Sequence, residues 1–216
     1  MRSKWINRVL SVALLFTTLT TSVSYTFTTA YAEEAGASTQ QSAQSGVSWP
    51  EAPEISAGNG ILIDADTGAI LYEKNAYTKC YPASTTKILT GLLTVENCSM
   101  DETVTFSRAA ANSVTWEDNL ATKVGEQYTV EQALYGLLLY SANEIAYGLA
   151  EHVGGSLENF VEMMNARARE LGAVNTHFAN ASGLYDPNHY TTAYDMAMIA
   201  RGCYNNSTFV NIDSTE

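Results

Sequence analysis

The sequence predicts an α+β fold in which a helical region packs on an antiparallel sheet. Two apolar runs of strand length, residues 60–64 and 69–73, flank the turn sequence Ala65-Asp66-Thr67-Gly68 and predict a β-hairpin. Most apolar residues between about 84 and 204 recur instead at helical spacing. Because two strands alone are marginal, the hairpin is expected to need further strand partners.

The first 52 residues are expected to lie outside the folded domain. Residues 1–32 have a basic start (Arg2, Lys4, Arg8), a short apolar run and the small-x-small sequence Ala30-Tyr31-Ala32, which together are typical of a cleaved signal peptide. An uncleaved N-terminal anchor is the alternative, and either interpretation takes the protein out of the cytoplasm. Residues 33–52 are mainly Ala, Ser, Gln and Gly and predict a flexible linker. One domain is expected over 53–216.

Charge excludes one class of partner. Without residues 1–32 the chain has eight basic and 23 acidic residues, a formal net charge of −15. Nucleic-acid binding needs a basic surface, and anionic lipid needs a polybasic segment. Neither is present, so no nucleic-acid partner is expected.

A pair of residues at helical spacing provides the first candidate for catalysis. Pro82 and the polar residues after it precede the apolar positions Ile88, Leu89, Leu92 and Leu93, a pattern typical of a helix N-terminus where Ser or Thr caps free N–H groups. Ser84 and Lys87 then share a helix face. A serine needs a proton acceptor to become nucleophilic, and a buried lysine can be one because desolvation lowers its pKa. The alternative is a helix cap beside a solvated lysine.

Further elements are expected along the rest of the chain. An extended segment is predicted at 100–106, a short helix at 107–115 and irregular structure at 116–125. Capping boxes at Thr129-Val130-Glu131-Gln132 and Thr192-Ala193-Tyr194-Asp195 each open a helix, the second running to about 204. A further helix is predicted at 156–171 and a loop at 180–189. Residues 205–216 indicate no clear element.

Ser141-Ala142-Asn143 interrupts an apolar helical run with two polar residues. Considered alone, it is the corner between two helices, capped by Ser141. Downstream of a Ser-x-x-Lys helix it is also a second candidate group for the same site.

The cysteines and histidines form no recognisable pattern. Cys80, Cys98 and Cys203 are too few and too scattered in the sequence for a disulfide framework or a zinc site, and their odd number leaves at least one thiol free. His152, His177 and His189 lack metal-binding spacing. One of them could serve Ser84 as a base, although Lys87 is nearer in sequence.

Taken together, these motifs resemble the serine D-alanyl-D-alanine carboxypeptidases, the low-molecular-mass penicillin-binding proteins of the DD-peptidase/β-lactamase-like fold. The resemblance rests on the hairpin 60–75, on Pro82-Ala83-Ser84-Thr85-Thr86-Lys87, on the stretch 134–144 that contains Ser141-Ala142-Asn143, and on 160–195. Ser-x-x-Lys, Ser-x-Asn and Lys-Thr-Gly, in this order, are the family's three motifs.

The resemblance implies a role for each matching residue. Ser84 would be the acyl-forming nucleophile, with its backbone N–H in the oxyanion hole, and Lys87 its general base. Ser141 would relay a proton to the leaving amine, and Asn143 would bind the substrate backbone. The implied substrate is a peptidoglycan stem peptide ending in D-Ala-D-Ala, β-lactam antibiotics are the implied inhibitors, and neither metal nor organic cofactor is required.

The chain departs from the family pattern in one important respect. No Lys-Thr-Gly follows Asn143, so the domain over 53–216 is expected to be C-terminally incomplete, inactive as it stands, and without the C-terminal membrane anchor common in the family. The resemblance also implies that the predicted hairpin is the N-terminal hairpin of a larger antiparallel sheet, the rest of which is absent from the chain. Two alternatives stay open: a non-catalytic cell-wall-binding or regulatory relative, and a class A β-lactamase. The β-lactamase is disfavoured because residues 171–190 hold no Glu to activate the deacylating water. The protein is expected to be exported and to work at the cell wall or the outer face of the cytoplasmic membrane.

Overall fold

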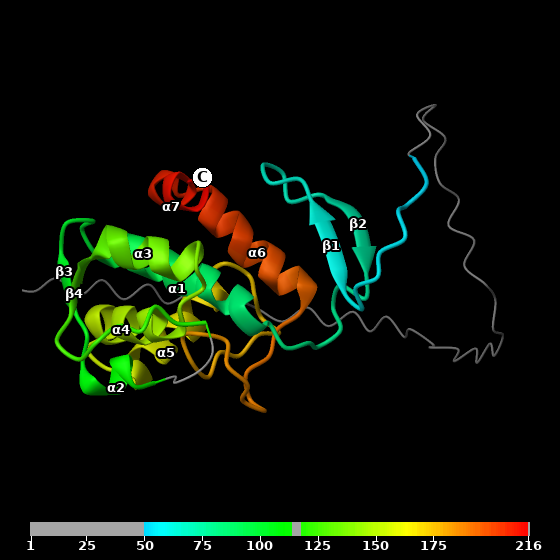
Figure 1. Ribbon diagram of the computed structural model, residues 1–216. Coiled ribbons are helices and arrows are strands. Elements are labelled where there is room, and N and C mark those ends of the chain that lie inside the picture. Colours follow the sequence, from blue (N-terminus) through cyan, green and yellow to red (C-terminus); the bar gives the residue numbers. More distant parts are fainter. Residues whose placement is uncertain (1–49, 114–117, 216) are drawn as a thin grey trace, which may run out of the picture. The chain divides into compact units, whose positions relative to one another are not determined.

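The computed structural model describes residues 50–113 and 118–215, so the predicted signal peptide and all but the last three residues of the predicted linker lie outside the described residues. Figure 1 shows the order of the elements. They are β1 (Gly60–Ile63), β2 (Ile70–Lys74), the 3₁₀ turn η1 (Ala83–Thr85), α1 (Thr86–Asn97), β3 (Thr103–Thr105), α2 (Arg108–Ala111), β4 (Gln127–Thr129), α3 (Val130–Leu138), α4 (Asn143–Gly154), α5 (Leu157–Glu170), α6 (Ala193–Tyr204) and α7 (Ser207–Asp213).

Helix α1 is the centre of the helical region. It contacts α3, α4, α5, α6 and α7, and its apolar residues Leu89, Leu92 and Leu93 are buried in the core. Polar residues on the same helix are also buried, namely Thr86, Lys87, Thr90 and Thr94. Thr90 and Thr94 bond to backbone carbonyls through their hydroxyls, at Ala181 O (2.7 Å) and Thr90 O (2.8 Å). A helix surrounded on so many sides fixes the position of the groups at its N-terminus.

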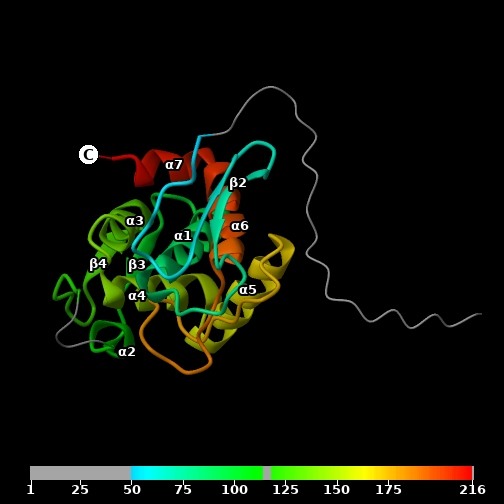
Figure 2. The same ribbon diagram turned by 90° about the vertical axis from the view of Figure 1, so that its right-hand side faces the viewer.

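The predicted hairpin is confirmed. Strands β1 and β2 pair antiparallel, with Gly60 opposite Lys74. In the turn, the Asp64 carboxylate accepts hydrogen bonds from Thr67 N and Oγ1, and Gly68 has the positive φ of 75° that favours glycine. The Arg201 side chain on α6 donates to the carbonyls of Ala65 and Asp66, both at 2.7 Å, which holds the hairpin against α6 (Figure 2).

A second, smaller sheet was not expected. Strand β3 lies within the extended segment predicted at 100–106, but its antiparallel partner β4 falls where no strand was predicted. Because β4 has only three residues and is separated from β3 by residues 106–126, which include α2, no hairpin pattern marks it. The fold class is therefore α+β as predicted, with two separate two-stranded sheets in the described residues.

Helix caps largely follow the sequence. Thr129 forms the expected capping box with Gln132, and Thr192 accepts from Asp195 N as an N-cap. The Asp195 carboxylate, however, accepts from Asn175 N and Thr176 Oγ1, so it stabilises a neighbouring loop instead of completing a box. Helix α7 lies where no clear element was predicted, because a helix of seven residues depends on packing, here through buried Phe209 and Ile212.

A search of the described residues for a helix long and apolar enough to cross a bilayer finds none.

Candidate active site

The Ser84 hydroxyl and the Lys87 ammonium group are in direct contact. Lys87 Nζ donates to Ser84 Oγ at 3.0 Å and to the carbonyl of Ser182 at 2.9 Å. Ser84 lies in η1, and Lys87 lies in the first turn of α1, so the predicted shared face is confirmed. In this position the amine of Lys87, when neutral, can accept the proton that the Ser84 hydroxyl must lose.

Burial gives Lys87 the right acidity for that role. The residue is 2% exposed, and desolvation lowers the pKa of its ammonium group to about 8, against a smaller opposite effect of Asp118. A substantial fraction of the amine is then neutral near neutral pH, which a solvated lysine would not allow. The alternative of a solvated lysine is therefore wrong.

The start of the nucleophile helix differs in detail from the prediction. Neither η1 nor α1 has a side-chain N-cap; instead the Thr85 hydroxyl donates to Pro82 O at 2.6 Å. Ala83 adopts a positive φ of 48°, an unusual conformation for a residue with a Cβ. This turn presents Ser84 to the pocket, and its hydroxyl is left for Lys87.

The turn that carries Ser84 forms the first wall of the site, and the predicted corner between α3 and α4 forms the second. Ser141 has a φ of 62°, and Asn143 N donates to Asp118 O at 2.8 Å. The Ser141 Oγ is buried and has no hydrogen-bond partner among the described residues. An unpartnered buried hydroxyl costs free energy, so this atom is a candidate for work that begins when a substrate binds.

The third wall is the loop 180–189. The Asn180 Oδ1 accepts from the backbone N–H groups of Ser182 and Gly183, at 3.1 and 2.7 Å. Gly183 has a φ of 88°, and a Cβ there would clash with Ala83 O. The glycine thus lets the loop approach the turn before Ser84 and bring the Ser182 carbonyl to Lys87.

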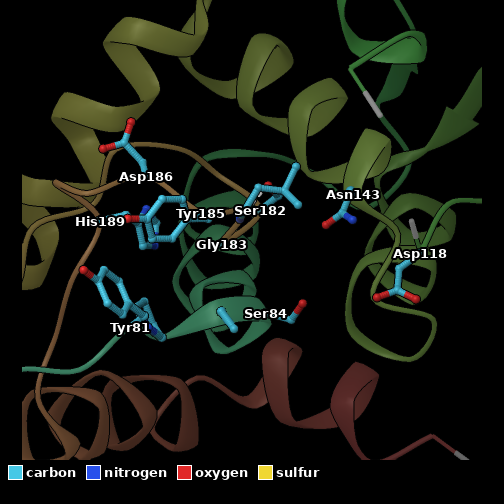
Figure 3. Close-up of a pocket in the computed structure, with 12 residues that line it drawn as sticks. Tyr81, Ser84, Asp118, Asn143, Ser182, Gly183, Tyr185, Asp186 and His189 are labelled. Carbon is cyan, nitrogen blue, oxygen red and sulfur yellow. Dashed lines mark hydrogen bonds between the residues drawn. The ribbon is translucent and has the colours of Figure 1, made fainter. Parts of the chain in front are cut away.

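These three walls enclose a pocket of about 340 Å³. Figure 3 shows Ser84 between Asn143 and Asp118 on one side and Tyr81, Tyr185 and His189 on the other. Lys87 does not line the pocket and reaches it only through its bond to the Ser84 hydroxyl. Of the site residues predicted from sequence, Ser84 and Asn143 line the pocket and Lys87 bonds to Ser84, whereas Ser141 is not among the lining residues.

Sequence reasoning missed Asp118 and the loop residues Asn180, Ser182 and Gly183, and it named His189 only as one of three possible bases. Asp118 stands in an irregular segment with no motif around it, and the loop carried only the turn signal of its glycine and proline. Their position beside Ser84 depends on contacts across more than 30 residues of sequence, so only the fold reveals it.

His189 does not compete with Lys87 for the role of base. Its Nε2 is 2.8 Å from Thr86 Oγ1, and its Nδ1 accepts from Ala179 N at 3.1 Å. Both ring nitrogens are therefore in use, and burial lowers the ring's pKa to about 4. The residue positions the loop against α1 as a neutral imidazole.

All three cysteines are free thiols. Cys203 is buried, and burial raises the pKa of its thiol to about 12; Cys80 is half-buried, and its pKa is raised for the same reason. Cys98 is half-buried as well, and its side chain lies with those of Glu102 and His152. His152 is 50 residues or more from Cys98 and Glu102 in sequence, so spacing along the chain did not mark this cluster.

A serine held by a buried lysine, faced by a Ser-x-Asn corner, defines the class of active-site serine acyl-transfer enzymes. The sequence profile of the peptidase S11 family, D-alanyl-D-alanine carboxypeptidase, matches residues 46–214. The chain belongs to this family, and the resemblance stated from the sequence is confirmed.

Individual relatives agree. The chain is 40% identical over 150 residues to the D-alanyl-D-alanine carboxypeptidase DacF of Bacillus subtilis, covering 67% of this chain and 38% of DacF. It is 34% identical over 174 residues to the D-alanyl-D-alanine carboxypeptidase of a Streptomyces species, covering 76% of this chain and 60% of that one. The chain thus spans less than two thirds of the length of either relative.

Solved structures show the same fold. The D-alanyl-D-alanine carboxypeptidase DacD of Francisella tularensis superposes with a TM-score of 0.71 at 34% identity, covering 79% of this chain and 43% of that one. Penicillin binding protein 6B of Escherichia coli gives 0.71 at 32% identity, covering 76% and 55%.

Proposed function

We propose that the protein is a penicillin-sensitive serine D,D-carboxypeptidase that removes the terminal D-alanine from peptidoglycan stem peptides. The observation that carries this proposal is the 3.0 Å contact between Ser84 Oγ and the Nζ of a lysine that is 2% exposed. Family membership supplies the substrate class, since the related proteins are named as D-alanyl-D-alanine carboxypeptidases.

In the proposed reaction, neutral Lys87 accepts the Ser84 proton as Oγ attacks the carbonyl of the penultimate D-alanine. The Ser84 backbone N–H stabilises the oxyanion, and Ser141 passes a proton to the amine of the departing D-alanine. Asn143 binds the peptide backbone. Water then hydrolyses the ester and restores Ser84. A β-lactam would acylate Ser84 by the same attack and occupy the same pocket.

We also propose that the β1–β2 hairpin belongs to a larger sheet in the whole enzyme, which supplies the Lys-Thr-Gly motif and a second oxyanion donor. The exposed apolar residues of the hairpin support this: Leu62 is 56%, Ile70 41% and Leu71 46% exposed. Apolar strands of this kind are ordinarily covered or paired. In the same proposal, residues 1–32 direct export and the enzyme works at the cell wall.

Mass spectrometry after treatment with penicillin tests the assignment on the whole enzyme. One adduct is expected, on the peptide that contains Ser84, and none in Ser84→Ala. Ser113→Ala is a matched control, because that hydroxyl bonds to Ala110 O at 2.7 Å and does not line the pocket. An adduct on another residue, or a labelled Ser84→Ala protein, contradicts the proposal.

A further inference from the structure

Cys98, Glu102 and His152 form a cluster of three metal-ligand side chains. Their ligand atoms all lie within 4.8 Å of one another. The Glu102 Oε1 accepts from Ser99 N at 2.6 Å, and its Oε2 lies 3.2 Å from His152 Nε2. The carboxylate is thus already oriented toward the histidine. None of the three residues lines the catalytic pocket.

The cluster lies where two helices end. Cys98 is the C-cap of α1, and His152 lies in the last turn of α4. The C-terminus of a helix carries a negative partial charge, which favours a cation nearby. Residues 98–105, which lead from the end of α1 into β3, contain Asp101 and Glu102 and no Lys or Arg. The segment is therefore negatively charged, like the helix C-termini, and also favours a cation.

We propose that Cys98, Glu102 and His152 bind a zinc ion, with water as a fourth ligand. Thiolate, imidazole and carboxylate are the three protein ligands of zinc, and the thiolate argues against Mg²⁺ and Ca²⁺. Bond lengths of about 2.0–2.3 Å in a tetrahedron put ligand atoms roughly 3.3–3.8 Å apart. The 3.2 Å between His152 Nε2 and Glu102 Oε2 is close to that range. Small side-chain rotations would bring the remaining ligand atoms, which lie within 4.8 Å of one another, to the same separation.

The ion would join the two helices that carry the catalytic groups. Helix α1 begins next to Ser84 and includes Lys87, and α4 begins at Asn143. The zinc would hold the opposite ends of both helices. Twelve residues at about 1.5 Å each place Cys98 roughly 18 Å from the start of α1. The ion therefore fixes the packing of α1 on α4 and takes no part in the chemistry at Ser84.

Titration of the chelator-treated full chain with ZnCl₂ and with CoCl₂ tests the proposal. We expect one ion per chain, a cobalt spectrum with thiolate charge transfer and tetrahedral d–d bands, and no response to MgCl₂. At one hundred times the dissociation constant, zinc should raise Tm by roughly 5–10 °C. In the whole enzyme, the rate of acylation by penicillin should change less than twofold when zinc is added.

Variants separate the cluster from other thiols and imidazoles. Cys98→Ser and His152→Ala should each weaken zinc binding at least tenfold, and Cys98→Ser should remove the charge-transfer band. The matched controls Cys80→Ser, at another half-buried thiol, and His177→Ala, at an exposed imidazole, should bind as the unmodified chain does.

Alkylation of the unmodified chain gives an answer that does not depend on how a variant folds. Zinc should protect one thiol, identified by mass spectrometry as Cys98. If Glu102 and His152 form only an ion pair and Cys98 only packs, zinc will protect no thiol and give no stoichiometric titration. Either result, or full zinc affinity in Cys98→Ser, overturns the proposal.

Discussion

Acylation of Ser84 should depend on pH through Lys87. With a pKa of about 8, about one tenth of the lysine side chains are neutral at pH 7 and about nine tenths at pH 9. The second-order rate constant for penicillin should therefore rise about tenfold between these pH values and level off above. An ordinary lysine pKa of 10.5 would leave about 1 in 3,000 side chains neutral at pH 7. Burial therefore raises the fraction of neutral, reactive Lys87 at pH 7 about 300-fold.

The assay is the rate of labelling by a fluorescent penicillin, measured from pH 6 to 10. Lys87→Arg should abolish labelling at every pH, because guanidinium stays protonated. Lys79→Arg is the matched control: its ammonium group lies 3.6 Å from the Tyr190 ring centre, and it does not line the catalytic pocket. The control should keep both rate and pH profile.

A flat profile from pH 7 to 9 would refute the reasoning. It is also what a His189 base would give, because a ring with a pKa of about 4 is neutral over the whole range. Full labelling of Lys87→Arg would refute it independently.

The same burial affects stability. The pKa of Lys87 is lower in the folded chain than in the unfolded chain, so the unfolded chain binds more protons between about pH 8 and 10.5. The cost of burying the ammonium is fully present below pH 8 and is relieved as pH rises through that window. Compared with Lys87→Met, the unmodified chain should therefore gain unfolding free energy between pH 8 and 10.5, and denaturant titrations at both pH values measure the difference.

Three further substitutions test other parts of the site and fold. Ser141→Ala should leave the unfolding free energy unchanged or higher, because Oγ has no partner among the described residues, and should slow acylation about 100-fold; a stability loss above about 1 kcal/mol would mean that the hydroxyl is structural. Gly183→Ala should lower the unfolding free energy measured in denaturant by about 3 kcal/mol or more. Gly172 has nearly the same positive φ but open space around it, so Gly172→Ala should lower it by only about 1–2 kcal/mol. Equal losses would contradict the close approach of Gly183 to Ala83. Thr129→Ala should cost about 1 kcal/mol in the same assay by removing the capping box of α3, and no change would show that packing alone holds that helix.

The sequence by itself determined the elements that depend on local patterns. The hairpin, the capping box at Thr129 and the nucleophile helix all follow from turn chemistry, caps and periodicity, which act over a few residues. The pairing of Ser84 with Lys87 followed for the same reason, since both lie within one helical turn. Ser141 and Asn143 were found because they interrupt an apolar run.

The tertiary structure decided what depends on distant segments. Strand β4 has three residues and forms only because β3 lies beside it, and α7 forms because Phe209 and Ile212 find a core to enter. The lowered pKa of Lys87 comes from packing around α1, which no local pattern measures. The fold places Gly183 beside Ala83, 100 positions away in sequence, and Cys98 beside His152, 54 positions away. Chain folding sets such distances through the whole core, so a linear pattern of residues does not contain them.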